Sequence, residues 1–394
     1  MRPHLAPILS LLLVAAATAQ SVPIGSHDVA WSNASGVGSP VLEAKVWYPA
    51  TAAGVDQPVA PHAGGWPTIV FLHGLGMHGS DYVRLAHAFV QRGFAMVMLD
   101  TGQWSHTVLE ADGRAMFAAI AAANGPASTS PLLQGAFDCG RVGLLGHSMG
   151  GAVVGLVLAD NPGYRCGIAI APVYPGPTVT QVDVPFGIVV GHGDYITPWP
   201  IFSYPYYLDV APASGLKFLH VVDQSCDHMN IAGLWAGPAG LFEDVVSVET
   251  GFFDRFLDVR ANGLERCVGP TAMAAPRLLW FQKQVIEPQV WAATDPTIGN
   301  TVRVSVLGEG GVTLALAALT TSPGVPTAYG TLMLDLGSLY TLAQGPADRS
   351  GRMDTVVTVP NLPQLIGLPF AMQAAGSTPA AALQLGSAVQ LFVQ

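Results

Sequence analysis

Short runs of apolar residues without polar alternation recur through the middle of the chain and predict strands buried on both faces. These runs are PTIVFLHG (67–74), FAMVMLD (94–100), RVGLLGHS (141–148), CGIAIAP (166–172), VPFGIVVGHGD (184–194) and LKFLHVV (216–222). Stretches typical of helices accompany them, namely DYVRLAHAFVQRG (81–93), RAMFAAIAAAN (114–124), GGAVVGLVLAD (150–160) and VVSVETGFFDRFLDV (245–259). Such a succession indicates an α/β fold, a mostly parallel sheet with helices on both faces. The alternating strand VLEAKVWYPA (41–50) precedes it.

The pattern changes after about residue 296. Residues 297–394 contain no His, Cys, Trp or Lys and offer short apolar runs such as TVRVSVLG and DTVVTVP, separated by Gly, Pro and Ser. This pattern of short apolar runs predicts a small all-β, sandwich-like C-terminal domain. The intervening stretch 268–296 is punctuated by proline and reads as a linker with one or two short elements.

The N-terminal residues have the order typical of a secretory signal peptide. Arg2 precedes an apolar stretch, and Ala17-Thr18-Ala19 supplies small residues for cleavage after Ala19. A buried N-terminal helix is the alternative interpretation. No later segment has the ~18 uninterrupted apolar residues of a membrane span. We expect a signal peptide (1–19), an α/β domain (20–267), a linker (268–296) and a β-rich domain (297–394), in a protein that is secreted, periplasmic or held at the cell surface.

Composition narrows the function classes only slightly. Of 394 residues, 50% are hydrophobic and 11% charged, which favours a large ordered core over disorder. The formal net charge of −10 argues against nucleic acid or an anionic membrane as a partner.

Candidate chemistry is concentrated at Gly146-His147-Ser148-Met149-Gly150. In a chain with 45 glycines a Gly-x-Ser-x-Gly pentapeptide is weak evidence by itself. Here, however, it follows a predicted strand and begins a predicted helix, which is the context of a nucleophile elbow. The sharp turn needs glycines where a Cβ would clash. We interpret Ser148 as a nucleophile; the alternative is a plain turn serine.

A serine hydroxyl needs a base, and an acid and a histidine follow such a serine in that chain order. Three histidines come after Ser148. His220 lies inside a predicted strand and should point into a helix-covered face, and His192 lies two residues before the best acid candidate. His228, in the loop DQSCDHMN, is free to reach Ser148 and is the predicted base.

The acid should follow the strand before the last one, and Asp194 occupies that place in GIVVGHGDYITP. Its role would be to orient the imidazole and stabilise the imidazolium. Asp183 precedes the strand and would lie at the wrong end of the sheet. Asp223 and Asp227, in the same loop as His228, are the rivals.

An oxyanion formed at Ser148 needs two backbone N–H donors. The residue after the nucleophile, Met149, supplies one, and Leu75 in the loop FLHGLGMHG is the predicted second. His73 and His78 in this loop have no carboxylate at ligand spacing, so we expect no metal site, and no other cofactor is indicated.

Residues 41–267 resemble the α/β-hydrolase fold. They are most similar to the bacterial cutinase and polyester hydrolase group, followed by dienelactone-hydrolase-like and platelet-activating-factor-acetylhydrolase-like enzymes. The residues that carry the resemblance are WYPA, HGLGMHGSDYVRLAHAFVQRGFAMVMLD, GHSMGG, GHGDYITP with SYPYY, KFLHVVDQSCDH and FFDRFLDVRANGLERCVGP. The resemblance implies esterase chemistry through an acyl-enzyme, with Ser148, Asp194 and His228 as the triad.

Two departures from the polyester hydrolases concern the substrate pocket. Those enzymes place an aromatic residue in the oxyanion loop, where this chain has Leu75. After the sixth strand the nearest ring is Tyr174, which we take with His147 as a pocket candidate. The departures favour aliphatic or lipid-like esters over aromatic polyesters.

The cysteines depart from the family as well. The family's cysteine near Cys267 pairs with a later one that this chain lacks, which leaves Cys226 as its partner. Cys139 and Cys166 would begin neighbouring strands and form a second disulfide. Free thiols are the alternative.

The sequence thus favours a secreted serine hydrolase that acts on ester substrates, small, lipid-like or polymeric. A serine peptidase of the same fold is the second hypothesis. A non-catalytic adhesion or binding protein on a hydrolase scaffold is the third. The C-terminal domain reads as a surface-attachment or sorting module, or as a domain that only packs on the first.

Overall fold

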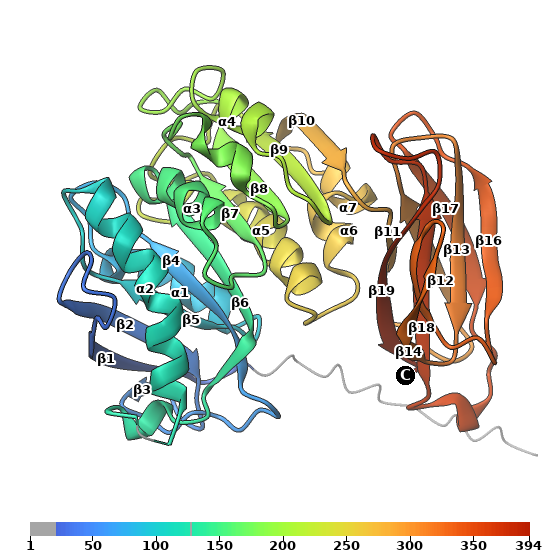
Figure 1. Ribbon diagram of the computed structural model, residues 1–394, viewed down its shortest axis with the longest axis horizontal. Helices are drawn as coiled ribbons and strands as arrows, with labels where there is room; N and C mark the ends of the chain where they lie inside the picture. Colours follow the sequence, from blue (N-terminus) through green and yellow to red (C-terminus); the bar gives the residue numbers. More distant parts are fainter. Residues whose placement is uncertain (1–20, 127) are drawn as a thin grey trace, which may run out of the picture.

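The computed structural model describes residues 21–126 and 128–394. The predicted signal peptide therefore lies outside the described residues. The described chain forms a large sheet flanked by helices, followed by a β-rich unit (Figure 1). No helix in these ranges combines the length and the apolar character needed to cross a membrane.

Within the described residues the large sheet has ten strands in the order β10-β9-β8-β7-β6-β4-β5-β2-β1-β3. Neighbouring strands from β5 through β4 and β6 to β9 run parallel, whereas β2 joins β5 and β10 joins β9 in antiparallel fashion. The strands are β1 (Ile24–Ser32), β2 (Val41–Pro49), β3 (Gly54–Val55), β4 (Trp66–Leu72), β5 (Ala95–Leu99), β6 (Phe137–His147), β7 (Gly167–Ile170), β8 (Phe186–Gly191), β9 (Leu216–Val222) and β10 (Leu278–Val285).

Helices cover both faces of this sheet, which explains why its central strands are apolar without alternation. Helix α2 packs on α3, and α1 packs on α5. Figure 1 shows α2 and α3 in front of the sheet and α5 behind it. The α-helices are α1 (Val83–Val90), α2 (His106–Asn124), α3 (Met149–Ala159), α4 (Ser203–Asp209), α5 (Leu241–Phe256), α6 (Gly263–Cys267) and α7 (Pro270–Met273), and the 3-10 helices are η1 (Gly79–Tyr82), η2 (Pro131–Leu133), η3 (Pro177–Gln181) and η4 (Pro363–Leu365).

The β-rich unit consists, among residues 289–394, of a three-stranded sheet β11-β12-β17, a four-stranded sheet β16-β13-β18-β19 and the hairpin β14-β15. The two larger sheets share one apolar core that includes Val304, Ala315 and Met372. The strands are β11 (Gln289–Ala292), β12 (Thr301–Leu307), β13 (Val312–Ala318), β14 (Thr321–Thr327), β15 (Gly330–Leu334), β16 (Tyr340–Pro346), β17 (Arg352–Thr358), β18 (Pro369–Gly376) and β19 (Gln384–Phe392).

The stretch 268–296, expected to be a linker, carries more regular structure than its prolines suggest. It contains α7, then β10 at the edge of the large sheet, then β11 at the edge of the β-rich unit. Only residues 286–288 separate β10 from β11. The chain therefore passes almost directly from one sheet into the other.

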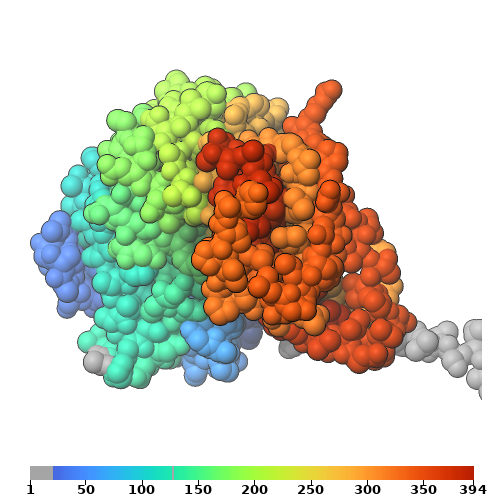
Figure 2. Space-filling view, turned by 45° about the vertical axis from the view of Figure 1, so that its right-hand side comes forward, coloured from blue at the N-terminus to red at the C-terminus, as the bar shows by residue number. Residues whose placement is uncertain are grey.

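Glu265 of α6 is the centre of the contact between the two units. One of its carboxylate oxygens accepts a hydrogen bond from Arg303 at 2.8 Å, and the other accepts from the indole of Trp291 at 2.9 Å. Burial raises the pKa of Glu265, but these bonds and two from Thr271 outweigh it, so the net pKa is lowered. In Figure 2 the orange and red atoms of the β-rich unit lie directly against the first unit.

The predicted disulfide between Cys139 and Cys166 is wrong, because both are free thiols. Leu144 of β6 pairs with Gly167 of β7, so Cys166 lies beside residue 143. Cys139 lies four residues earlier on β6, roughly 13 Å away along the strand. A disulfide needs Cα atoms within about 7 Å.

The predicted pair Cys226 and Cys267 is also wrong, since both are free and buried. The Cys226 sulfur packs at the end of β8, where a Cβ on Gly191 would lie 3.0 Å from it. Cys267 ends α6, and its carbonyl accepts a hydrogen bond from His220 of β9 at 2.6 Å. Burial raises the pKa of both thiols, which makes them unreactive packing residues.

His220 yields a prediction about stability and pH. Burial lowers its pKa from 6.5 to about 4, so below pH 6.5 the unfolded chain binds a proton that the folded chain does not. The contribution of His220 to stability is therefore fully present above pH 6.5 and is lost as the pH falls toward 4, a loss on the order of 3 kcal/mol. Urea unfolding of His220→Gln should show a weaker decline between pH 7 and 4 than the wild type. His192→Gln, at an exposed histidine, is the control, and equal declines in all three proteins would contradict the prediction.

Candidate active site

Ser148 occupies a sharp strand-to-helix turn between β6 and α3. Its φ of 57° lies in the left-handed region, which a residue with a side chain rarely adopts. Glycines on both sides make the turn possible. A Cβ at Gly146 would overlap the carbonyl oxygen of Gly150, and a Cβ at Gly150 would overlap the carbonyl oxygen of Leu72. The expected elbow geometry is therefore present.

The structure brings the three predicted side chains into one line. His228 Nε2 lies 2.9 Å from Ser148 Oγ, and His228 Nδ1 lies 2.7 Å from Asp194 Oδ2. Asp194 follows β8 and His228 follows β9, so all three come from the carboxyl ends of parallel strands. Asp194 and His228 are 3% and 5% exposed, which strengthens the electrostatic contact between them. A carboxylate can only accept, so Nδ1 carries the proton and Nε2 is free to accept from the serine.

Thr197, which the sequence did not predict as a site residue, completes the surroundings of Asp194. Asp194 Oδ1 accepts from the backbone N–H groups of Ile196 and Thr197 at 2.9 and 2.8 Å. The Thr197 hydroxyl lies 2.8 Å from Oδ2. Burial raises the pKa of Asp194, but the hydrogen bond and charge of His228 and the Thr197 donors together lower it overall. The spacing Asp-x-x-Thr in DYITP is an Asx-turn signal that would have found Thr197.

The rival histidines are placed elsewhere. His192 is exposed and its Nδ1 contacts Gln224. His220 is buried under helices and donates to the Cys267 carbonyl, as its position inside a strand predicted.

The other candidate aspartates make contacts away from Ser148 and His228. Asp223 pairs with Arg277 at 3.3 Å, and Asp227 accepts from the backbone N–H groups of Met229 and Asn230. Asp183 lies before β8, at the opposite end of that strand from Asp194.

Two backbone N–H groups remain available beside Ser148. Within the described residues neither Leu75 nor Met149 donates its N–H to another group. The flanking groups are occupied, because Gly74 N–H donates to the Tyr82 hydroxyl at 3.0 Å and Gly76 N–H donates to the Gln103 carbonyl at 2.7 Å. The predicted oxyanion donors are thus the free positions in this loop and at the start of α3.

A cavity of about 890 Å³ opens in front of Ser148. Both predicted pocket residues line it, but His147 is only 1% exposed and Tyr174 hydrogen-bonds Asp209. Trp104, which sequence analysis did not single out, also lines the cavity and is 78% exposed. It comes from the loop between β5 and α2 and packs on Gly76, where a Cβ would lie 2.6 Å from the indole.

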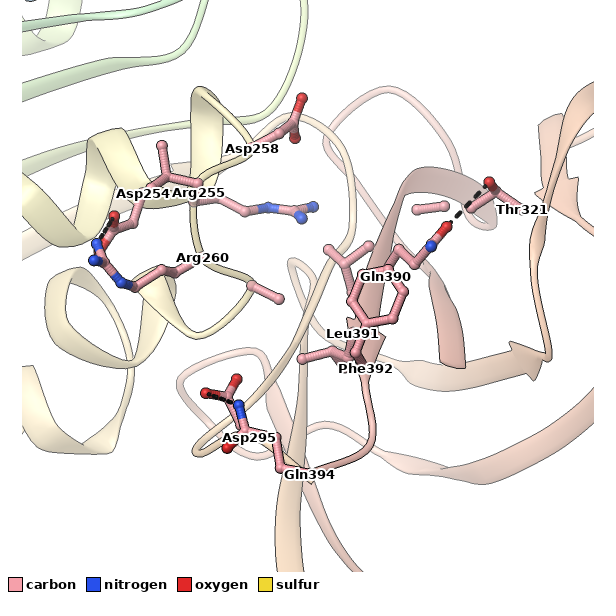
Figure 3. A pocket seen from close by; sticks show the side chains of 14 residues that line it. Asp254, Arg255, Asp258, Arg260, Asp295, Thr321, Gln390, Leu391, Phe392 and Gln394 are labelled. Carbon is pink, nitrogen blue, oxygen red and sulfur yellow. Dashed lines mark hydrogen bonds and ion pairs between the residues drawn. The ribbon is translucent and has the colours of Figure 1, made fainter. Parts of the chain in front are cut away.

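A second cavity, of about 600 Å³, lies between α5 and β19 (Figure 3). Its charged side chains include Asp254, which pairs with Arg260 at 2.8 Å, and Arg255, which donates to the side-chain carbonyl of Gln289 at 3.0 Å. Among the described residues, its lining includes no Ser, Cys or His. This cavity belongs to the junction of the two units.

Comparison with known proteins places the chain in a family. Residues 13–258 match a family model described as PET hydrolase-like, which is more than half of the chain. The chain belongs to the PET hydrolase-like family. This confirms the resemblance to polyester hydrolases seen in the sequence. The PET hydrolase-like match ends within the helical part of the first unit, before the β-rich residues 289–394.

A curated relative gives a second comparison. The PET hydrolase-like chain is 25% identical over 170 residues to bis(hydroxyethyl) terephthalate hydrolase of Streptomyces coelicolor. The alignment covers 42% of this chain and 52% of that protein. The chain thus spans about half the length of this relative.

The packing of the elbow yields a prediction about folding. Gly150→Ala places a methyl group onto the Leu72 carbonyl in a fully buried turn, so unfolding free energy should fall by at least about 2 kcal/mol. Gly125→Ala is a matched control, since its nearest neighbouring atom would be 3.5 Å away. Thermal unfolding of the two variants measures the difference. An unchanged midpoint for Gly150→Ala would contradict the tight packing of this turn.

Proposed function

We propose that this PET hydrolase-like protein hydrolyses carboxylic esters through an acyl-enzyme, with Ser148 as nucleophile, His228 as base and Asp194 as acid. The observation that supports this most is the pair of hydrogen bonds at 2.9 and 2.7 Å that joins the three side chains. Family membership supports the same chemistry. The available N–H groups of Leu75 and Met149 supply the other requirement for acyl transfer, a place for the developing oxyanion.

The reaction would begin with transfer of the Ser148 hydroxyl proton to His228 Nε2 while Oγ bonds to the ester carbonyl carbon. The carbonyl oxygen becomes an oxyanion, which accepts from the Leu75 and Met149 N–H groups. The carbon–oxygen bond to the alcohol then breaks, and the imidazolium gives its proton to the departing alkoxide oxygen. Asp194 stays ionised throughout and stabilises the imidazolium.

Water would complete the cycle. His228 removes a proton from water while the water oxygen bonds to the acyl carbon. The new oxyanion collapses, the bond from the acyl carbon to Oγ breaks, and the serine regains the proton from His228. The products are a carboxylic acid and regenerated Ser148.

The lining of the cavity favours binding of uncharged esters with an apolar or aromatic part. Leu75, Trp104 and Ile196 line it and are 59%, 78% and 51% exposed, so an apolar ligand would cover them. Trp104 provides an aromatic surface next to the oxyanion loop, although Leu75 replaces the family's aromatic residue. We therefore extend the substrate class beyond the aliphatic esters favoured by the sequence. The named substrate of the relative, bis(hydroxyethyl) terephthalate, is a suitable probe.

Location and attachment belong to the same proposal. The signal-like residues 1–19 support export, and the β-rich unit of residues 289–394 would act as a surface-attachment or sorting module.

The nucleophile is tested by Ser148→Ala. Wild-type protein should react with a fluorophosphonate probe and hydrolyse p-nitrophenyl butyrate, and the variant should lose labelling and about 10⁴- to 10⁶-fold in kcat. Ser35→Ala, at an exposed serine, controls for nonspecific labelling. Folded wild type that neither labels nor hydrolyses the ester would overturn the proposed function.

Trp104 is tested by Trp104→Ala. KM for bis(hydroxyethyl) terephthalate should rise about tenfold, because the variant loses one aromatic contact with the substrate. The change in KM for p-nitrophenyl acetate should be much smaller. Tyr329→Ala removes another exposed ring, in the β-rich unit, and should leave both constants unchanged. Equal KM changes for the two esters would argue against a ring-binding role.

A further inference from the structure

His147, the residue before Ser148, has both ring nitrogens engaged within the protein. Nε2 lies 2.8 Å from the backbone carbonyl of His228, and Nδ1 lies 2.9 Å from the Tyr82 hydroxyl. A carbonyl can only accept, so Nε2 carries the proton, and in a neutral ring Nδ1 must then accept from the tyrosine. Burial, and then the neighbouring His228, lower the pKa of His147 to about 3, which keeps the ring neutral.

The Tyr82 hydroxyl is also engaged on its other side. It accepts the backbone N–H of Gly74 at 3.0 Å, in the residue directly before Leu75. Tyr82 is 1% exposed and ends η1, so its ring is fixed by packing, including contact with Phe71 at a centroid distance of 4.5 Å. Its hydroxyl proton points to either His147 Nδ1 at 2.9 Å or Met77 Sδ at 3.2 Å, and the nitrogen is the stronger acceptor.

These bonds form one continuous chain. It runs from Gly74 N–H to the Tyr82 hydroxyl, then to His147 Nδ1, and from His147 Nε2–H to the His228 carbonyl. At one end of this chain of bonds the N–H of Gly74 is fixed, and Gly74 directly precedes Leu75, whose own N–H is free. The other end holds the peptide of His228, whose ring faces Ser148. The loop that contains Leu75 and the loop that contains His228 are thus connected through His147, the residue before Ser148.

We propose that Tyr82 and His147 are positioning residues that fix the Leu75 N–H and the His228 imidazole relative to each other around Ser148. The inference rests on the proposed function, because it concerns the same acyl transfer. Neither side chain touches the reacting atoms. A neutral His147 also suits its place, since its ring centroid is 4.7 Å from that of His228, which carries positive charge during the reaction.

Tyr82→Phe removes only the hydroxyl and is the main test. Loss of the link loosens both ends, so kcat for p-nitrophenyl butyrate should fall about 10- to 100-fold while KM stays within about twofold. The matched control is Tyr164→Phe, which removes another buried tyrosine hydroxyl, bonded to the Gly113 carbonyl at 2.7 Å. The control should lose comparable stability and keep wild-type kcat.

A double-mutant cycle tests whether Tyr82 acts through His147. His147→Gln keeps an N–H donor near the His228 carbonyl but removes the nitrogen that accepts from Tyr82. The double variant with Tyr82→Phe should then have a kcat no lower than that of the more impaired single variant. Fully multiplicative losses would overturn the linked arrangement, as would a Tyr82→Phe enzyme with wild-type kcat.

Nitrogen NMR of the imidazole rings tests the chain without turnover. At pH 7 His147 should be neutral with its proton on Nε2, and Tyr82→Phe should shift its Nδ1 resonance and the Leu75 amide resonance. A His147 proton on Nδ1, or unmoved resonances, would overturn the proposal even in an inactive protein. If activity is lost in Ser148→Ala but retained in Tyr82→Phe, only this inference is disproved. If the wild type is inactive, the proposed function is disproved.

Discussion

The tight backbone turn at Ser148 is the constraint on which the arrangement of the site depends. Its left-handed φ of 57° is maintained because β6, α3 and the end of β4 pack without room for a Cβ at residues 146 and 150. The turn points the hydroxyl away from the sheet at the carboxyl ends of parallel strands. Loops after β8 and β9 end at the same edge, so Asp194 and His228 reach it without any long connection.

The electrostatics of the site follow from which buried groups keep a charge. Protein donors replace water around Asp194, and the pKa of this carboxyl is lowered although burial acts in the opposite direction. The neighbouring His147 has its pKa lowered to about 3, because burial and then the nearby His228 outweigh the opposing effects of the His228 carbonyl and of Asp194. One buried carboxylate is therefore placed next to one imidazole that can accept a proton, and the second imidazole remains a neutral connector.

The sequence predicted the parts of the site that depend on strand order. Ser148, Asp194 and His228 each follow an apolar run, and parallel strands bring such positions to one edge. Register is not visible in an apolar run, and for this reason the Cys139–Cys166 pairing was wrong by four residues along β6. Tyr82 was missed because its hydroxyl contacts His147, which is distant in sequence, whereas Thr197 lies three residues from Asp194 in a spacing that does signal it. Strand β10 was not singled out, because its residues LLWFQKQV do not alternate between apolar and polar positions.

Strand β9 connects the site with the β-rich unit. One of its edges pairs with β8, which leads to Asp194, and the other pairs with β10, which continues into β11. On the β10 side, Lys283 donates to the Ser350 carbonyl at 2.6 Å, and the Val285 N–H donates to Glu309 at 2.5 Å. The β-rich unit is thus hydrogen-bonded to the strand that pairs with β9, the strand that leads to the loop of His228. Directed bonds of this kind, with Glu265 and Trp291 at the junction, hold the two units in one orientation in a way that apolar contact alone would not.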